Sequence, residues 1–131
     1  MKGLTQKQGK RKQAVARATI QSGSGKISIN GQELSNFGND MVRLRISEPL
    51  VLAGDLVKGI DIHVNSHGGG IHGQADAIRL AIARSLVETD KKLKKTFIEY
   101  DRLLLVADVR RKETRKPNDS KARAARQKSY R

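Results

Sequence analysis

Apolar residues that could build a hydrophobic core stop at Val109, and 22 further residues follow it in this 131-residue chain. Beyond that point the side chains are charged, polar or alanine, apart from Pro117 and Tyr130. Such a segment cannot offset the entropy lost on ordering, so we expect it to be disordered until a partner binds. The chain therefore divides into a globular body over residues 1–109, including a short basic N-terminal segment, and a tail over residues 110–131.

The charge is divided in the same way. The net charge is +14, yet residues 21–101 hold ten basic and ten acidic side chains. Residues 1–20 hold six Lys or Arg and no acid, and residues 102–131 hold eleven basic and three acidic residues. Basic segments on a neutral body are typical of a protein that binds a polyanion, and nucleic acid is the expected one.

The tail has the charge density of a phosphate-binding segment. Ten Lys or Arg stand among residues 110–131, six of them Arg, and only Glu113 and Asp119 oppose them. Arginine favours bidentate and stacking contacts over those of a simple point charge. Aromatic side chains on which unpaired bases could stack are missing from the tail, which disfavours a reader of single strands. We predict that the tail lies along phosphates.

Alternating and short apolar runs predict a small mixed sheet. Residues 13–20 and 26–29 have strand patterns, and the Ser/Gly stretch 22–25 between them favours a hairpin. Residues 60–64 alternate apolar and polar side chains, as expected of a strand with one face in water. The run 103–106 is wholly apolar, which predicts a short buried strand.

Helix signals lie between these strands. Asn39 or Asp40 is suited to cap a first helix, and Ser47 with Pro49 indicates a second helix start that Gly54 would end.

The strongest helical pattern follows a Gly-rich stretch and has a narrow apolar stripe at four-residue spacing: Ile78, Ile82 and Leu86. Arg79 and Arg84 are expected to point away from that stripe. Asp90 is suited to cap a last helix that carries Leu93 and Phe97. The order of these elements predicts an α/β (α+β) body of two layers, with helices packed on a mixed sheet.

Two segments of the chain match enzyme motifs only in part. A phosphate-binding P-loop that ends at Gly25-Lys26 would need Gly at position 20 and Ser or Thr at position 27, and both positions hold Ile. The stretch His67–Gly70 is similar to a lipase oxyanion-hole sequence, but the chain has no G-x-S-x-G nucleophile motif. Asp61 and Asp76 are expected to be solvated. We predict no catalytic residue.

Metal and cofactor sites are not expected either. The chain has no Cys, which also fits a reducing compartment. Its three histidines, His63, His67 and His72, would stand on a strand, a loop and a helix start, where they would not converge on one ion. No apolar run is long enough to cross a membrane, so no membrane partner is expected.

The glycine loop leaves two interpretations open, one structural and one functional. Glycines at this helix start could form a purely structural tight turn, or their backbone N–H groups could contact a phosphate. The residues concerned are Gly68, Gly69, Gly70 and Gly73.

Several segments together resemble one known family. The most specific are GGGIHGQADAIRLAIARSLVE (68–88) and the ending KARAARQKSYR (121–131). The others are GKRKQAVARATI (9–20), KISINGQEL (26–34), ISEPLVLAG (46–54) and YDRLLLVADVRRKE (100–113). The chain thus resembles the family of the ninth protein of the small ribosomal subunit, in its archaeal and eukaryotic branch, from about residue 9 to its last residue.

The resemblance implies a body with a left-handed β-α-β crossover and a place on small-subunit rRNA in the head of the small subunit, in the cytoplasm. Implied partners are that rRNA, the tRNA of the peptidyl site and neighbouring head proteins. By position, the implied rRNA contacts are Lys10, Arg11, Lys12, Arg110, Arg111, Lys112, Arg115, Lys116, Lys121, Arg123 and Arg126. The implied contacts with the tRNA anticodon stem-loop are Lys128, Ser129, Tyr130 and Arg131.

Two other functions are compatible with a basic chain of this kind. A non-specific compactor would bind DNA and RNA alike, with no discrete site. The second is an enzyme, because the fold of the resembled family is similar to that of the GHMP kinases. Such an enzyme would need a nucleotide pocket, and the chain is too short for one. The path of the tail through residues 116–120 also stays open, because many relatives carry Gly where this chain has KPNDS.

Overall fold

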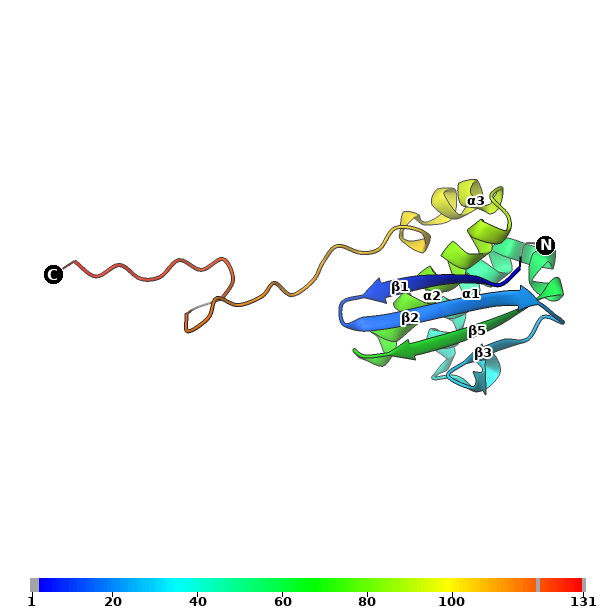
Figure 1. Ribbon diagram of the computed structural model, residues 1–131, viewed down its shortest axis with the longest axis horizontal. Coiled ribbons are helices and arrows are strands. Elements are labelled where there is room, and N and C mark those ends of the chain that lie inside the picture. Colours follow the sequence, from blue (N-terminus) through cyan, green and yellow to red (C-terminus); the bar gives the residue numbers. More distant parts are fainter. Residues whose placement is uncertain (1–2, 120, 131) are drawn as a thin grey trace.

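Five strands form one mixed sheet in the order β1-β2-β5-β3-β4, and three α-helices pack against it, giving an α+β body. The computed structural model describes residues 3–119 and 121–130. The strands are β1 (Thr5–Arg11), β2 (Ala14–Ser22), β3 (Ile27–Ile29), β4 (Gln32–Glu33) and β5 (Ile60–His67). The helices are α1 (Asp40–Ala53), α2 (Ile71–Thr89) and α3 (Leu93–Tyr100). Figure 1 shows α1 and α2 behind the sheet and α3 beyond the β1 edge.

The first hairpin joins β1 to β2, so the predicted hairpin between β2 and β3 was wrong. β2 pairs with β1 on one side and β5 on the other, both antiparallel, while β3 pairs in parallel with β5. Strand β1 was missed because its sequence, TQKQGKR, has no apolar residue. Its inward positions are filled by Gly9 and by the long side chains of Lys7 and Arg11, whose charged ends reach acids on α2.

Helix α1 is continuous from Asp40 to Ala53, so the predicted second helix start at Ser47 was wrong. The Asn39 side chain caps it by accepting the Val42 N–H at 3.0 Å. Pro49 lies inside the helix and is buried, and the Ser47 hydroxyl donates to the Arg43 carbonyl at 2.8 Å. Gly54 ends the helix with φ of 58°, as expected of a glycine stop.

The predicted strand at 103–106 is instead a short 3₁₀ turn, Arg102–Leu104. The Asp101 carboxylate accepts the Leu103 N–H at 2.9 Å and so begins the turn. Leu104 is fully buried, whereas the Leu103 side chain is 41% exposed. Periodicity alone does not distinguish a short buried strand from a buried helical segment, and here the Asp101 cap begins a 3₁₀ turn.

Helix α2 is buried on more than the predicted stripe. Ten of its residues are buried: Ala75, Ala77, Ile78, Arg79, Leu80, Ala81, Ile82, Ala83, Ser85 and Leu86. Buried alanines of α2 and of β2 belong to one core cluster, and their small side chains allow helix and sheet to approach closely. Phe97 of α3 is fully buried in the core cluster, and Leu93, four residues earlier, packs against that cluster while partly buried. The predicted apolar face of this helix is thus the one that meets the core.

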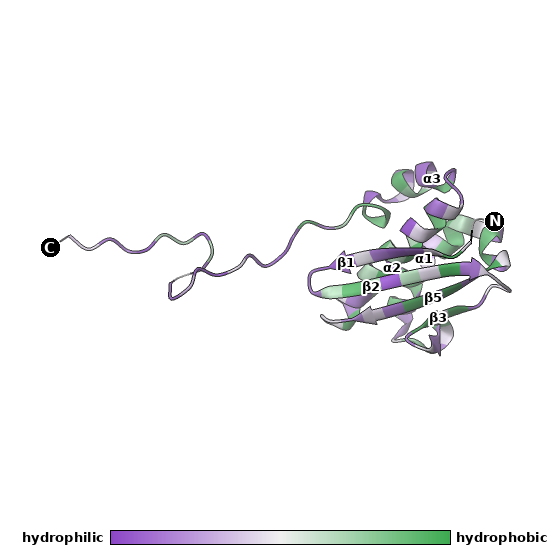
Figure 2. Cartoon of the chain, viewed as in Figure 1, coloured by the Kyte–Doolittle hydropathy of each residue, from purple (hydrophilic) through white to green (hydrophobic). Residues whose placement is uncertain are grey.

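From Leu105 onward the described residues form no helix or strand. Most of their side chains are exposed, including Val109 and Tyr130. Figures 1 and 2 show this hydrophilic segment leading away from the end of the sheet where β1 turns into β2.

Candidate nucleic-acid interface

Three predicted sites that are far apart in sequence meet at one end of the sheet. One surface hollow is lined by Lys12, Gln13, Arg110, Arg111 and Lys112. An adjoining hollow shares Lys12 and Gln13 and is lined further by the loop at Gly69 and Gly70 and the first turn of α2. The β1–β2 turn (Lys12 and Gln13), the glycine loop (Gly68–Gly70) and the first tail residues (Arg110–Lys112) are called the basic end below.

The predicted cluster at residues 10–12 is split by the pleat of β1. Lys10 and Lys12 are exposed and have no hydrogen-bonded or ionic partner among the described residues. Arg11 turns inward, with 17% of its side chain exposed, and its guanidinium lies 3.7 Å from Asp76 and 3.3 Å from Asp108. Lys10 and Lys12 therefore face solvent, whereas Arg11 forms ion pairs within the protein.

The glycine loop is shaped by its contact with the β1–β2 turn. Gly68 and Gly69 have φ of 75° and 61°, a conformation that other residues rarely adopt. A Cβ on Gly68 would lie 2.6 Å from the Gln13 carbonyl oxygen, and one on Gly69 would lie 3.1 Å from the Ala14 nitrogen. These two glycines have a structural role in bringing the loop against the turn.

The other two glycines are under less constraint. A Cβ on Gly70 would meet nothing within 4 Å, and one on Gly73 would make only ordinary contact with Ala14. Gly70 precedes α2 without a side-chain cap, and the first turn of α2 carries no acid. Asp76 also lines this hollow but is paired with Arg11 and Arg45, and phosphate contact at the loop stays a prediction.

The base of the tail is fixed by one carboxylate. Asp108 accepts hydrogen bonds from the backbone N–H of Arg110 at 2.9 Å and from its guanidinium at 2.7 Å. These bonds from Arg110, helped by the nearby charge of Arg11, hold the pKa of Asp108 well below its usual range. Asp108 therefore stays ionised and joins the first tail residue to the last residue of β1.

A chain of ion pairs continues inward from this point. Asp76 was expected to be solvated but receives the Arg45 guanidinium at 2.9 Å as well as Arg11, and the hydrogen bond to Asp76 raises the pKa of Arg45. Arg79 was expected to point outward, but its side chain is 4% exposed and pairs with Glu48 and with Asp101, the latter at 2.9 Å. Both predictions were wrong for the same reason. Each of these ion pairs joins residues from different elements, which the local sequence does not show.

Further along the tail, acids partly neutralise the predicted contacts. Glu113 receives the Arg123 guanidinium at 2.8 Å, and Asp119 lies 3.4 Å from Arg126. Lys116 donates to the Ala124 carbonyl at 3.0 Å. The tail cations whose side chains have no partner among the described residues are Arg111, Lys112, Arg115, Lys121 and Lys128.

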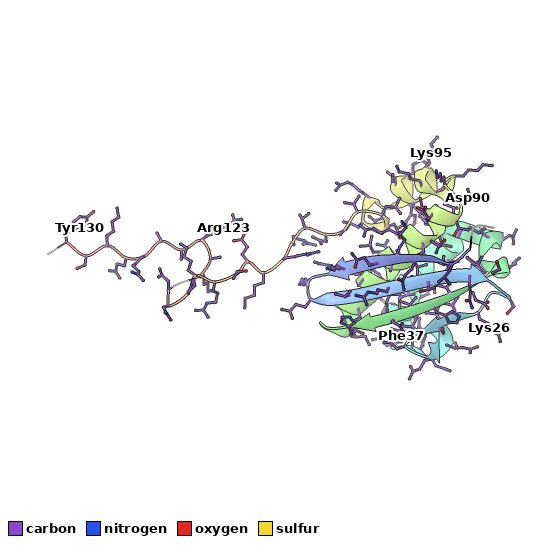
Figure 3. The ribbon with its side chains drawn as sticks, in the orientation of Figure 1. Lys26, Phe37, Asp90, Lys95, Arg123 and Tyr130 are labelled. Atoms are coloured by element: carbon purple, nitrogen blue, oxygen red, sulfur yellow. The ribbon has the colours of Figure 1, made fainter. Side chains whose placement is uncertain are left out.

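The predicted tip of the tail is described through Tyr130. Lys128, Ser129 and Tyr130 are exposed, and Figure 3 shows Tyr130 and Arg123 projecting from the extended segment. Arg131, predicted to contact tRNA, lies outside the described residues.

The histidines are not gathered into one cluster. His63 and His67 project from β5 into solvent, and His72 stands in the first turn of α2. His63 is hydrogen-bonded to Ser28 at 2.7 Å and to Gln21 at 3.3 Å. Within residues 3–119 and 121–130, no group of three His, Asp or Glu side chains is placed to hold a metal ion. No helix in those same ranges is long and apolar enough to span a membrane.

The chain is similar in sequence to known proteins. A family described as Ribosomal protein S9/S16 matches residues 9–131. The small ribosomal subunit protein uS9 of Pyrobaculum aerophilum is 49% identical over 125 residues, covering 94% of this chain and 88% of that protein. That of Picrophilus torridus is 50% identical over 127 residues, covering 95% and 96%. That of Thermoplasma volcanium is 50% identical over 125 residues, covering 94% and 95%.

Proposed function

Because this chain belongs to the ribosomal protein S9/S16 family, we propose that it is a structural protein of the small ribosomal subunit that binds rRNA in the subunit head. The family is one of ribosomal structural proteins, and the chain is not an enzyme. The observation that carries the proposal is the match over residues 9–131, which includes both the basic end and the whole tail. The protein then works on the ribosome, in the cytoplasm, beside other head proteins.

The body supplies shape and the tail supplies charge. Lys12 and the first tail residues present cations around one hollow of the body, so rRNA phosphates can contact the body and the base of the tail together. Binding releases condensed counterions, and its salt dependence should rise by about 0.7–0.9 per phosphate neutralised. The tail cations from Arg110 to Arg126 then anchor the segment in rRNA.

The tip is proposed to act on a different RNA. The family resemblance implies that Lys128, Ser129, Tyr130 and Arg131 contact the anticodon stem-loop of the tRNA in the peptidyl site. Basic and hydroxyl groups at an exposed chain end suit such a contact with a sugar–phosphate backbone. The resemblance also implies that the connection from β3 through α1 to β5 is a left-handed crossover, which an experimental structure of the body would decide.

Deleting residues 110–131 tests the anchoring role. We expect the body to remain folded by circular dichroism, while its affinity for the head RNA of the small subunit falls. A chemical footprint of the intact chain on one segment of that RNA is also expected. Equal protection of all RNA and DNA would instead favour a non-specific compactor.

Removing Arg131 alone tests the tip. Assembly of the subunit should be unchanged, and tRNA should dissociate faster from the peptidyl site of purified subunits. Unchanged tRNA affinity would refute this role of the tip without affecting the rRNA anchor.

A further inference from the structure

The face of the sheet turned away from the helices is left open. Along β2 the side chains of Ala14, Ala16, Ala18 and Ile20 are buried on the helix side, and the residues between them point the other way. Figure 1 shows the strands in front of α1 and α2, and none of the described helices lies over this front face. The neighbouring strands β1, β2 and β5 all contribute side chains to this face.

The half of this face away from the basic end satisfies its own polar groups. Gln6 of β1 donates to Thr19 of β2 at 3.2 Å. His63 of β5 is hydrogen-bonded to Ser28 at 2.7 Å and to Gln21 at 3.3 Å. These side chains have found partners inside the protein, and this half needs no ligand.

The half next to the basic end differs. It consists of Gln8 and Lys10 from β1, Arg17 from β2, and Asn65 and His67 from β5, and is called the sheet patch. All five residues are exposed, and their side chains have no hydrogen bond or ion pair with other described residues. Gln8, Arg17 and Asn65 lie in one row across the three strands, because Arg17 is in register with both of the others.

The sheet patch is also free of acids. The acids on the open face are Asp61, opposite Gln21, and Glu33 on the short edge strand β4, so both lie in the other half or at its edge. The side chains of Lys10 and Arg17 therefore have no ion-pair partner among the described residues, although Lys10 also borders the hollow that holds Asp76 and Asp108. Lys10 lies two residues before Lys12, so the sheet patch continues directly into the basic end.

The chemistry of the patch selects one kind of partner. Guanidinium, ammonium and amide groups donate to phosphate and ribose oxygens. The patch has no aromatic side chain, so stacking on unpaired bases is not its mode of binding. Folded RNA helices are recognised through their shape, phosphates and 2′-hydroxyls. We propose that the sheet patch is a second RNA-binding surface, which holds the sugar–phosphate backbone of a folded small-subunit RNA helix.

This proposal rests on the proposed function, and its test separates the two. Dissociation constants of the full chain with transcribed small-subunit head RNA would be measured over a series of salt concentrations. Three double variants are compared: Lys10→Gln/Arg17→Gln in the patch, Arg111→Gln/Arg115→Gln in the tail, and Lys58→Gln/Lys95→Gln as the control. Each removes two exposed cations, and the control pair lies beside Asp55 and Glu99, away from both surfaces.

The patch variant should reduce the salt slope by about 1.4–1.8, for two lost phosphate contacts, and the control should not change it. A reduced slope in the tail variant alone would overturn the sheet patch and leave the rRNA anchor in place, as expected if a neighbouring protein covers the face. An equal reduction in patch and control would also overturn it, because the effect would not be local. No reduction in any variant would refute both proposals. Circular dichroism of each variant confirms its fold.

Discussion

The guanidinium of Arg11 lies 3.3 Å from the carboxylate of Asp108, which connects the last residue of β1 to the segment that leads into the tail. The same carboxylate holds Arg110 through its backbone N–H and its side chain. The direction in which the tail leaves the body is therefore set by an ion pair with the sheet. Charge-assisted hydrogen bonds of this kind are stronger and more directional than neutral ones.

Replacing Asp108 with Asn should loosen the base of the tail. The amide keeps one acceptor but loses the charge that holds both arginines. We expect the NMR order parameters of residues 110–112 to fall towards about 0.6 or below, the range of flexible backbone. Glu113→Gln is the matched control, because it releases Arg123 further along and leaves Arg110 bound. Unchanged order at Arg110 in the Asp108 variant would contradict this role.

Acid should destabilise the fold through three aspartates. Asp61 accepts the Lys26 and Ser24 N–H groups, and these hydrogen bonds lower its pKa. Burial opposes ionisation of Asp101, but the Leu103 N–H and the Arg79 guanidinium outweigh it, and the pKa of Asp101 is lowered as well. The pKa of Asp108 is lowered by Arg110.

A folded-state pKa below the unfolded value, which is about 4 for Asp, contributes stability that is present above that value. That contribution is lost as the pH falls below about 4. The free energy of unfolding, measured with denaturant between pH 2 and pH 7, should therefore decline at the acid end. The decline should be shallower in Asp101→Asn, and parallel curves for variant and parent would exclude Asp101 as a cause.

Arg79→Met should cost about 3 kcal/mol in the free energy of unfolding, at the low end for a broken buried ion pair. Arg79 is buried between Glu48 and Asp101, and its loss leaves two carboxylates unpaired beside the core. Both keep some contact with water, which limits the cost. Lys7→Met breaks an exposed pair with Glu88 and should change stability by less than about 1 kcal/mol. Equal effects in urea unfolding would show that burial of the pair does not matter.

Gly9→Ala should destabilise the body by about 1–3 kcal/mol or more, as overpacking does. A Cβ at Gly9 would lie 2.2 Å from the Ala77 carbonyl oxygen and 2.7 Å from the Ala81 nitrogen, so β1 would have to move away from α2. Gly59→Ala is the control, because a Cβ there meets nothing within 4 Å. Thermal unfolding compares the two, and similar melting temperatures would mean that β1 shifts freely.

The predicted elements that were right are those whose sequence pattern is local. Alternation identified β2 and β5, and the apolar spacing of Ile78, Ile82 and Leu86 identified α2. Strand β1 could not be found in this way, because its inward face is made of Gly9 and of long cations that need acids on α2. Local patterns could not predict the strand order either, because β5 lies between β2 and β3 although it follows both of them in the sequence.

The candidate site was predicted as a set of basic residues. The structure shows that some of them form ion pairs within the protein and that others face solvent. A charge count treats Arg11, Arg110 and Arg111 alike, but Asp108 takes the first two and leaves the third in solvent. The sheet patch was missed because Gln8, Arg17 and Asn65 are scattered in sequence and meet only through strand register. Registers of this kind depend on tertiary pairing, which no single segment encodes.

Arg11 and Lys12 are adjacent basic residues of one predicted cluster, and the structure gives them opposite roles. Arg11 is turned inward to Asp76 and Asp108, whereas Lys12 is exposed at the β1–β2 turn. Arg11→Gln should lower the free energy of unfolding by about 1–3 kcal/mol, since two carboxylates lose a partly buried partner. Lys12→Gln should leave that free energy within about 0.5 kcal/mol of the parent.

The salt slope of RNA binding should respond to the same two variants in the opposite way: it should fall for Lys12→Gln and not for Arg11→Gln. Lys12→Gln removes a solvent-facing cation beside Arg111 and should lower the salt slope of binding to small-subunit head RNA by about 0.7–0.9. Arg11→Gln should leave the slope unchanged under conditions where the variant is still folded, because the Arg11 side chain is turned inward and mostly buried beside Asp76 and Asp108. Denaturant unfolding and salt-dependent filter binding on the same two preparations give both readouts. If Arg11→Gln lowered the slope while the fold stayed intact, the inward orientation of Arg11 would not persist on RNA, and all three cations at residues 10–12 would have to be counted as contacts.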